Sequence, residues 1–195
     1  MMIRGYDFSH YQKNNYKQYR DGDFYILKAT EGTGYIDKVA LGEIAPYFKN
    51  MNRVLGFYHF AHPEKNTPLK EANHFIKQVK PFLPCILALD WEANALKCDI
   101  AWARKWLDIV YKKTGIKPLF YCSSWYVDKI GDAISSGDYG LWVARYSNFA
   151  KPQTGKWGRF AIWQYTSKPV DTDYFNGNLT ALKKYAIPDK EIKDE

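Results

Sequence analysis

Seven short apolar segments recur along the chain, separated by polar turns and helical patterns. They are Ile3–Phe8, Phe24–Thr30, Arg53–Phe60, Cys85–Glu92, Lys117–Ser123, Gly140–Tyr146 and Phe160–Thr166. Several of these segments are continuously apolar and do not alternate with polar residues, which is typical of strands covered on both faces. The pattern therefore predicts the strands of a parallel sheet.

Helical patterns fall between these strands. Thr67–Val79 begins with a Thr-Pro pair suited to an N-cap and first turn, and its apolar residues share one face. Asp99–Gly115 has a capping aspartate at its start and a glycine where the apolar period stops. Asp37–Asn50 predicts a third helix, in which Pro46 introduces a kink.

Seven or eight strands in 195 residues leave little room for a full helix after each strand. Beyond residue 124 the helical patterns are shorter and the strands lie closer together. Repeated strand–helix units fit an open doubly wound sheet or a closed barrel. We expect an α/β fold: an irregular TIM-like β/α barrel with about eight strands and fewer than eight helices. Residues 1–186 form one barrel domain, and Ile187–Glu195 is a charged tail or the start of a linker.

The sharpest chemical feature is an apolar strand that runs into two carboxylates, Asp90 and Glu92. On a strand these side chains point to the same face, about 6–7 Å apart, and Leu89 and Trp91 point to the other face. In β/α barrels, catalytic groups sit at the C-terminal ends of the strands. Two neighbouring carboxylates repel, so that one tends to hold a proton, as acid-assisted glycoside cleavage requires. The alternative is a strand end whose acids only meet solvent.

Two further acids stand next to predicted strands. Asp7 ends the first strand, and Asp171 follows the last one. A closed barrel would place its first and eighth strands side by side and bring both acids to one rim. Asp173, two residues further on, is an alternative to Asp171. Each of these acids also fits a turn or a helix cap.

Composition and charge change this picture only slightly. Aromatic residues make up 17% of the chain, a weak indication of a carbohydrate groove. The net charge of +7 attracts polyanions, and without any nucleic-acid-binding signature it fits either an anionic wall polymer or a solvated basic face. The cysteines have no disulfide or zinc spacing. Neither a signal peptide nor a membrane-spanning segment is recognisable.

Six motifs in order make the chain similar to a known family. It resembles the family 25 glycoside hydrolases, the muramidase or lysozyme family common among bacteriophage endolysins and bacterial wall enzymes. The motifs are Asp7–Gln12, Phe24–Gly32 with Tyr35 and Asp37, Gly56–Phe60, Leu89–Glu92, Leu141–Tyr146 and Trp163–Ser167. The resemblance covers nearly the whole chain, from about Gly5 to Phe175.

The resemblance implies cleavage of the β-1,4 bond from N-acetylmuramic acid to N-acetylglucosamine in bacterial peptidoglycan, without a cofactor. It implies that Glu92 is the general acid and that Asp90 assists it, in our hypothesis by orienting the N-acetyl group of the substrate as the nucleophile. Asp7 and Asp171 match the two further acidic positions. The segment between Thr166 and Val170 is short, which would trim the rim near Asp171.

Several side chains at predicted strand ends are expected to contact substrate. They are Tyr58, Tyr121, Trp142, Tyr146, Gln164 and Tyr165, and for each one packing in the core or rim is the alternative. His10, His59 and His62 have no metal-site spacing, so no metal is expected.

Two other functions stay open: a chitinase-like glycosidase, and a barrel that binds wall glycan without cutting it. The partner we expect is bacterial peptidoglycan, reached by a monomer that is made in the cytoplasm and acts on the cell wall. Release as a phage endolysin would suit such a protein. Neither nucleic acid binding nor membrane insertion is expected.

Overall fold

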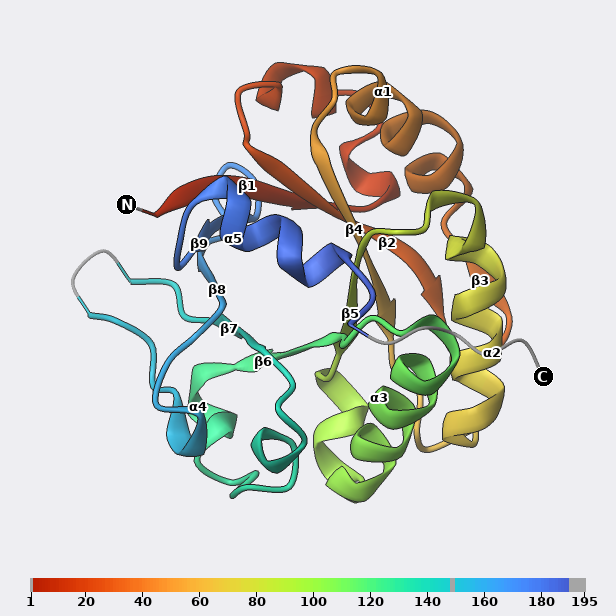
Figure 1. Ribbon diagram of the computed structural model, residues 1–195, viewed down its shortest axis with the longest axis vertical. Helices are drawn as coiled ribbons and strands as arrows, with labels where there is room; N and C mark the ends of the chain where they lie inside the picture. The colour runs from red at the N-terminus through yellow and green to blue at the C-terminus, as the bar shows by residue number, and fades with distance from the viewer. Residues whose placement is uncertain (1, 148–149, 190–195) are drawn as a thin grey trace.

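Eight strands close into a barrel in the computed structural model, which describes residues 2–147 and 150–189 (Figure 1). The strands are β1 (Ile3–Phe8), β2 (Phe24–Glu31), β4 (Val54–Phe60), β5 (Ile86–Asp90), β6 (Leu119–Ser123), β7 (Leu141–Ala144), β8 (Ile162–Thr166) and β9 (Thr172–Phe175). The ring closes because β1 pairs with β2 on one side and with β9 on the other. The short β3 (Tyr35–Ile36) pairs only with the end of β2. The predicted closed barrel is confirmed.

One strand of the ring runs against the others. The strands from β1 to β8 in the ring are parallel, whereas β9 is antiparallel to both β1 and β8. The sequence analysis missed β9 because it has four residues, two of them polar. The strand beside β1 is therefore this extra antiparallel strand, and the sheet is not purely parallel. Because β9 is antiparallel, it begins at the end of the barrel where β1 and β8 finish. Asp171 immediately precedes β9 and therefore lies at that end.

The two longest helices have the predicted boundaries. They are α2 (Pro68–Val79) and α3 (Ile100–Thr114). Thr67 caps α2 and Asp99 caps α3, each by accepting a backbone hydrogen bond with its side chain. Gly115 ends α3 at a φ of 69°, a left-handed conformation that glycine adopts without a steric penalty. Local capping chemistry therefore determines where these helices begin and end.

The predicted helix around Pro46 is continuous but changes from a π-helical to an α-helical conformation. A π-helical turn over Ala40–Ile44 leads directly into α1 (Ala45–Asn50). Proline has no N–H to donate and its ring crowds the preceding turn, so a wider turn just before Pro46 accommodates it. The remaining helices, α4 (Ser124–Val127) and α5 (Leu179–Lys183), are short, as the spacing of the later strands predicts.

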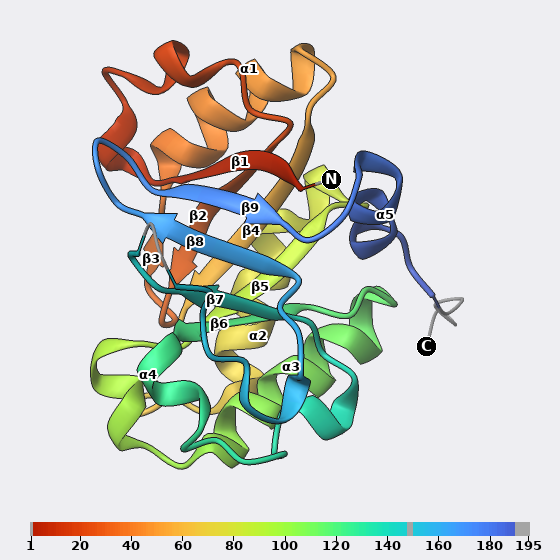
Figure 2. The same ribbon diagram turned by 90° about the vertical axis from the view of Figure 1, so that its left-hand side faces the viewer.

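Side chains fill the barrel, and α5 covers only one of its two ends. The interior layer contains Phe24, Ile26, Ile86, Ala88, Leu119, Trp142, Ile162 and Phe175. Leu182 of α5 is fully buried against this layer, and Figure 2 shows α5 at the end of the barrel where β1 begins. The opposite end, where the parallel strands finish, is therefore the one left for a functional site. A larger apolar cluster joins the outer faces of the strands to α1, α2 and α3.

The predicted C-terminal tail is described as far as Asp189. Its backbone N–H donates to the carbonyl oxygen of Gly115 at 2.9 Å, and its carboxylate accepts from the Tyr111 hydroxyl at 2.7 Å. The start of the tail thus packs against the end of α3. The rest of the tail, residues 190–195, lies outside the described residues.

Gly56 is required by close packing inside the barrel. A Cβ atom at this position would lie 2.9 Å from Cβ of Ile86 and 3.2 Å from Cγ1 of Ile26. We expect Gly56→Ala to lower the free energy of unfolding by about 1–3 kcal/mol, the usual cost of overpacking. Denaturant unfolding measures this effect, with Gly34→Ala as the control because its Cβ would meet nothing within 4 Å. Equal stability of the two variants would contradict the packing argument.

Candidate active site

A cavity of about 150 Å³ opens at the end of the barrel where the parallel strands finish. Its lining residues are Asp7, Tyr58, Asp90, Glu92, Tyr121, Trp142, Tyr146, Gln164 and Asp171. The structure thus brings together the four acids predicted from the sequence and five of the six side chains predicted to contact substrate. They come from both ends of the chain, and the closure of the barrel makes them neighbours.

The strand alternation that places Asp90 also places Glu92. Although β5 ends at Asp90, the backbone of Glu92 stays extended at a φ of −145° and a ψ of −173°. Both side chains therefore point into the cavity, and Leu89 and Trp91 are buried in the outer apolar cluster. The backbone N–H of Trp91 donates to the carbonyl oxygen of Tyr121 at 3.0 Å, which ties this segment to β6.

Gln164 connects the acids to the aromatic wall. Its Nε2 donates to Oδ2 of Asp7 at 2.7 Å. Its Oε1 accepts from the hydroxyl groups of Tyr121 at 3.0 Å and Tyr146 at 2.9 Å. The amide of Gln164 therefore faces Asp7 with its nitrogen and the two hydroxyl groups with its oxygen. Gln164 therefore holds three cavity residues in place at once.

Asp171 and Asp173 occupy different places. Asp171 lines the cavity, whereas Asp173 is fully buried and accepts a hydrogen bond from Nε1 of Trp142 at 2.8 Å. Asp173 is paired across the sheet with Gln164, the residue that donates to Asp7, so the two carboxyl groups are neighbours. Burial raises the pKa of Asp173 to about 7, and burial together with the nearby Asp173 carboxyl raises the pKa of Asp7. Asp173 thus lies behind Asp7 and is not among the residues that line the cavity, whereas Asp171 is.

Burial and mutual repulsion raise the pKa of the carboxyl groups in the cavity. Burial is the main cause for both Asp90 and Glu92, and for Asp90 the charge of Glu92 adds to it. The Lys28 ammonium acts in the opposite direction and lowers the pKa of both groups. The pair therefore binds a proton more tightly than an isolated carboxyl group does. Oδ1 of Asp90 is buried with no hydrogen-bond partner among the described residues, which adds to the cost of ionising this carboxyl group.

A second hollow of about 560 Å³ extends the cavity along one side. It shares Glu92, Tyr121 and Tyr146 with the cavity and is also lined by Trp125 and Arg145. Trp125 and Tyr146 are each more than half exposed, so their ring faces are accessible. The site is thus an open groove, which suits a polymer better than a small molecule. Sequence reasoning missed Trp125, for which the available signal was an aromatic residue just beyond the end of β6.

Tyr165 lies away from this groove. Since neighbouring residues of a strand point to opposite faces, the inward position of Gln164 turns Tyr165 outward. Its ring stacks on that of Tyr174 with centroids 4.7 Å apart. The structure therefore does not bring Tyr165 together with the other predicted contacts.

Within residues 2–147 and 150–189, no group of three or more His, Cys, Asp or Glu side chains is arranged to hold a metal ion. Over the same residues, no helix has the length and apolarity needed to cross a bilayer. His59 is fully buried and bonds Glu71, while His10 bonds Asp37 and His62 bonds Glu31.

Known proteins share both the sequence pattern and this fold. The N,O-diacetylmuramidase of Chalaropsis sp is 29% identical over 213 residues, which cover 94% of this chain and 99% of that protein. A family GH25 lysozyme from Aspergillus fumigatus has a TM-score of 0.74 and 28% identity over 95% of this chain and 99% of its own. The catalytic domain of endolysin ply40 from bacteriophage P40 of Listeria monocytogenes has a TM-score of 0.69 and 25% identity over 95% of this chain and 98% of its own.

The family assignment rests on the greater part of the chain. The family model for glycosyl hydrolases family 25 matches residues 6–174, from the first strand to the last. This region includes the four acids of the cavity and the aromatic wall of the groove. It confirms the resemblance that six ordered motifs indicated. The chain therefore belongs to family 25 of the glycosyl hydrolases and is a glycoside hydrolase.

Proposed function

We propose that this chain is a peptidoglycan muramidase that cleaves the β-1,4 bond between N-acetylmuramic acid and N-acetylglucosamine. The observation that carries the proposal is the pair Asp90 and Glu92 at the closed end of an open, aromatic-lined groove. Relatives that match over nearly their full length are an N,O-diacetylmuramidase and a lysozyme, which supports this substrate.

Glu92 is the general acid in this proposal. Burial raises its pKa, which favours the protonated form that a proton donor needs. Its carboxyl group lines both the cavity and the adjoining groove, so a glycosidic oxygen spanning the two would meet it. Proton transfer to that oxygen breaks its bond to C1 of the muramic acid residue.

Asp90 assists by holding the N-acetyl group of the same sugar. Its carboxyl group lines the cavity and accepts the N–H of that group, and the acetyl carbonyl oxygen forms a bond to C1 as the glycosidic bond breaks. The negative charge of Asp90 stabilises the positive charge of the cyclic intermediate. The Glu92 carboxylate then takes a proton from water, whose oxygen bonds to C1 and releases the acetyl oxygen. The net reaction is hydrolysis of the glycosidic bond by one water molecule, with the anomeric configuration retained.

Asp7 and Asp171 complete the wall opposite this pair. The Asp7 carboxyl is held in place by the hydrogen bond from Gln164, so it offers substrate hydroxyl groups a rigid acceptor. Asp171 is partly solvated, and its charge raises the pKa of Glu92. We assign substrate positioning to Asp7 and maintenance of the Glu92 proton to Asp171.

The site of action follows from the substrate. A groove open along one side admits an intact glycan strand, and the net charge of +7 favours an anionic wall surface. We propose a monomer in which residues 1–186 form the catalytic unit, acting on the bacterial cell wall. Similarity to the catalytic domain of a phage endolysin is in keeping with a lytic role.

The new reducing end identifies the bond that is cut. Digestion of purified peptidoglycan, followed by borohydride reduction and mass spectrometry, is expected to give fragments that end in reduced N-acetylmuramic acid. Fragments ending in reduced N-acetylglucosamine would assign a glucosaminidase instead. Digestion of chitin at a comparable rate would favour the chitinase-like alternative, and glycan binding without any cleavage would favour a binding barrel.

A further inference from the structure

A chain of alternating charges runs from the protein surface toward the acid pair. Nζ of Lys28 lies 2.7 Å from Oε2 of Glu31, and Oε1 of Glu31 lies 2.8 Å from Nε2 of His62. Nδ1 of His62 in turn lies 2.7 Å from Oε1 of Glu64. Lys28 is largely buried, with its ammonium 4.7 Å from the centroid of the Phe60 ring. Each member of the chain is therefore held on two sides.

Both ring nitrogens of His62 face a carboxylate. A neutral imidazole has one donor and one acceptor nitrogen, so only the imidazolium form can donate to Glu31 and Glu64 together. Partial burial lowers the pKa of His62, but the hydrogen bonds to Glu64 and Glu31 outweigh it and leave the pKa above its usual value. Burial raises the pKa of Glu31, but the hydrogen bonds from Lys28 and His62 outweigh it and leave this pKa below its usual value. The geometry thus favours a charged His62.

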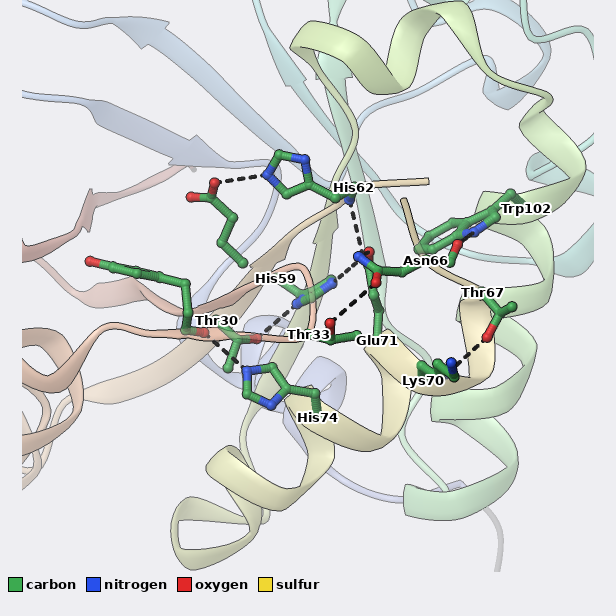
Figure 3. A network of polar contacts seen from close by, with 12 residues as sticks. Thr30, Thr33, His59, His62, Asn66, Thr67, Lys70, Glu71, His74 and Trp102 are labelled. Carbon is green, nitrogen blue, oxygen red and sulfur yellow. Dashed lines mark hydrogen bonds and ion pairs between the residues drawn. The ribbon is translucent and has the colours of Figure 1, made fainter. Parts of the chain in front are cut away.

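Other groups around His62 fix its backbone and complete its charge environment. Its backbone N–H donates to Oε2 of Glu71, which also bonds Nε2 of the buried His59 at 2.7 Å. Figure 3 shows His59, His62 and Asn66 converging on Glu71, and Asn66 donates to its Oε1 at 2.8 Å. Lys65 lies 3.9 Å from Glu64. His62 thus projects from a rigid buried network, and only its ring takes part in the charge chain.

The inner end of this chain lies beside the strand that carries the acid pair, because Phe60, whose ring contacts the Lys28 ammonium, is paired with Glu31 on one side and with Asp90 on the other. The Lys28 ammonium lowers the pKa of Asp90 and of Glu92, whereas the Glu31 carboxylate raises that of Asp90. With His62 charged, the negative charge of Glu31 is balanced, and the effect of Lys28 prevails. With His62 neutral, the net charge of Lys28, Glu31, His62 and Glu64 falls from zero to −1, and the acid pair holds its protons more tightly.

We propose that the imidazolium of His62 is a positioning residue for the acid pair: it holds Glu31, and through Glu31 the Lys28 ammonium, beside Asp90 and Glu92. The inference rests on the proposed function, because it assigns those two carboxyl groups to the reaction. It adds a dependence of catalysis on a side chain that contacts neither the cavity nor the groove.

The pH range of this arrangement follows from the direction of each shift. The pKa of His62 is raised, so its contribution is present below its ordinary value of 6.5 and is lost as the pH rises through the raised value. The pKa values of Glu31 and Glu64 are lowered, so their contributions are present above 4.5 and are lost as the pH falls through the lowered values. The charge chain is therefore complete in mildly acidic to neutral solution.

Paired substitutions of His62 separate its charge from its shape. His62→Gln removes the charge, and we expect the acidic limb of the kcat/KM profile to move up by about half a pKa unit, as for a charge acting through neighbours. At a pH on that limb this lowers kcat/KM about threefold. His62→Arg keeps a cation between the two glutamates and is expected to follow the wild-type acidic limb. The control is His74→Gln, because the ring of His74 bonds the Tyr35 carbonyl oxygen and takes no part in the charge chain.

Two results would overturn the proposal. One is a His62→Gln profile that coincides with that of the wild type and of His74→Gln. The other is an acidic limb for His62→Arg displaced as far as that for His62→Gln, because then the shape of the imidazole and not its charge would matter. Melting temperatures of all variants show whether any change in activity reflects unfolding.

Direct titration keeps this test separate from the proposed function. The chain has 4 histidines, so NMR can follow the His62 ring in the intact protein, and we expect a pKa above 6.5. Carboxyl ¹³C shifts of Asp90 and Glu92 should titrate at higher pH in His62→Gln than in the wild type. Neither measurement needs turnover: failure to cut peptidoglycan would remove the proposed function, and unchanged carboxyl titrations would remove the role of His62.

Discussion

Glu92→Gln is expected to lower kcat on purified peptidoglycan by roughly 10²–10⁴-fold, the usual contribution of a general acid. The amide has nearly the same shape but cannot give a proton to the glycosidic oxygen. KM should change little, because the groove walls formed by Tyr121, Tyr146 and Trp125 remain. The rate of release of new reducing ends, measured over a range of substrate concentrations, separates the two constants.

The control for this variant is Glu43→Gln. Glu43 is a surface acid 3.7 Å from Lys13, remote from the cavity, and its replacement should leave kcat unchanged. Unfolding midpoints of both variants confirm that the protein is folded. A Glu92→Gln enzyme within a factor of two of the wild type would show that another group donates the proton, and Asp171 would be the next candidate because it lines the same cavity.

Asp90→Asn is expected to reduce kcat and to increase stability. The neutral amide cannot stabilise the positive cyclic intermediate, for which we expect a loss of roughly 10²–10³-fold, typical of an electrostatic contact in a buried site. Burial and the charge of Glu92 raise the pKa of Asp90 in the folded protein. The stability linked to its proton is therefore present at low pH and is lost as the pH rises. Removing the carboxyl group should consequently raise the free energy of unfolding at neutral pH.

Three measurements check this prediction. Denaturant unfolding at pH 7 should give Asp90→Asn a higher free energy of unfolding than the wild type. The control Asp132→Asn, at an exposed position, should match the wild type in free energy of unfolding and in kcat. NMR of the product anomer in the first moments of digestion should show retention. An inverted anomer would eliminate the route through the N-acetyl group, and full activity of Asp90→Asn would remove Asp90 from the reaction.

The local sequence pattern alone determined the starts of the long helices and the faces of the strand that carries the acid pair. Helices α2 and α3 begin at Thr67 and Asp99 because short polar side chains satisfy the free N–H groups of a first turn, whatever lies around them. The alternation of a strand likewise put Asp90 and Glu92 on one face and Trp91 on the other. Such features depend on neighbours in the chain, so the sequence is sufficient to predict them.

Tertiary structure decided what depends on contacts between distant residues. β9 has too few apolar residues to be recognised alone, and it forms because β1 and β8 offer it hydrogen bonds on both sides. Its direction places Asp171 at the cavity and buries Asp173 behind Asp7. The tie from Gln164 to Asp7 joins residues 157 positions apart, and His62 meets Glu31 across 31 positions. The sequence thus determined which side chains could do the chemistry. Barrel closure decided which carboxyl groups are neighbours and which cations balance their charge, because electrostatic interaction depends on distance in space and on burial.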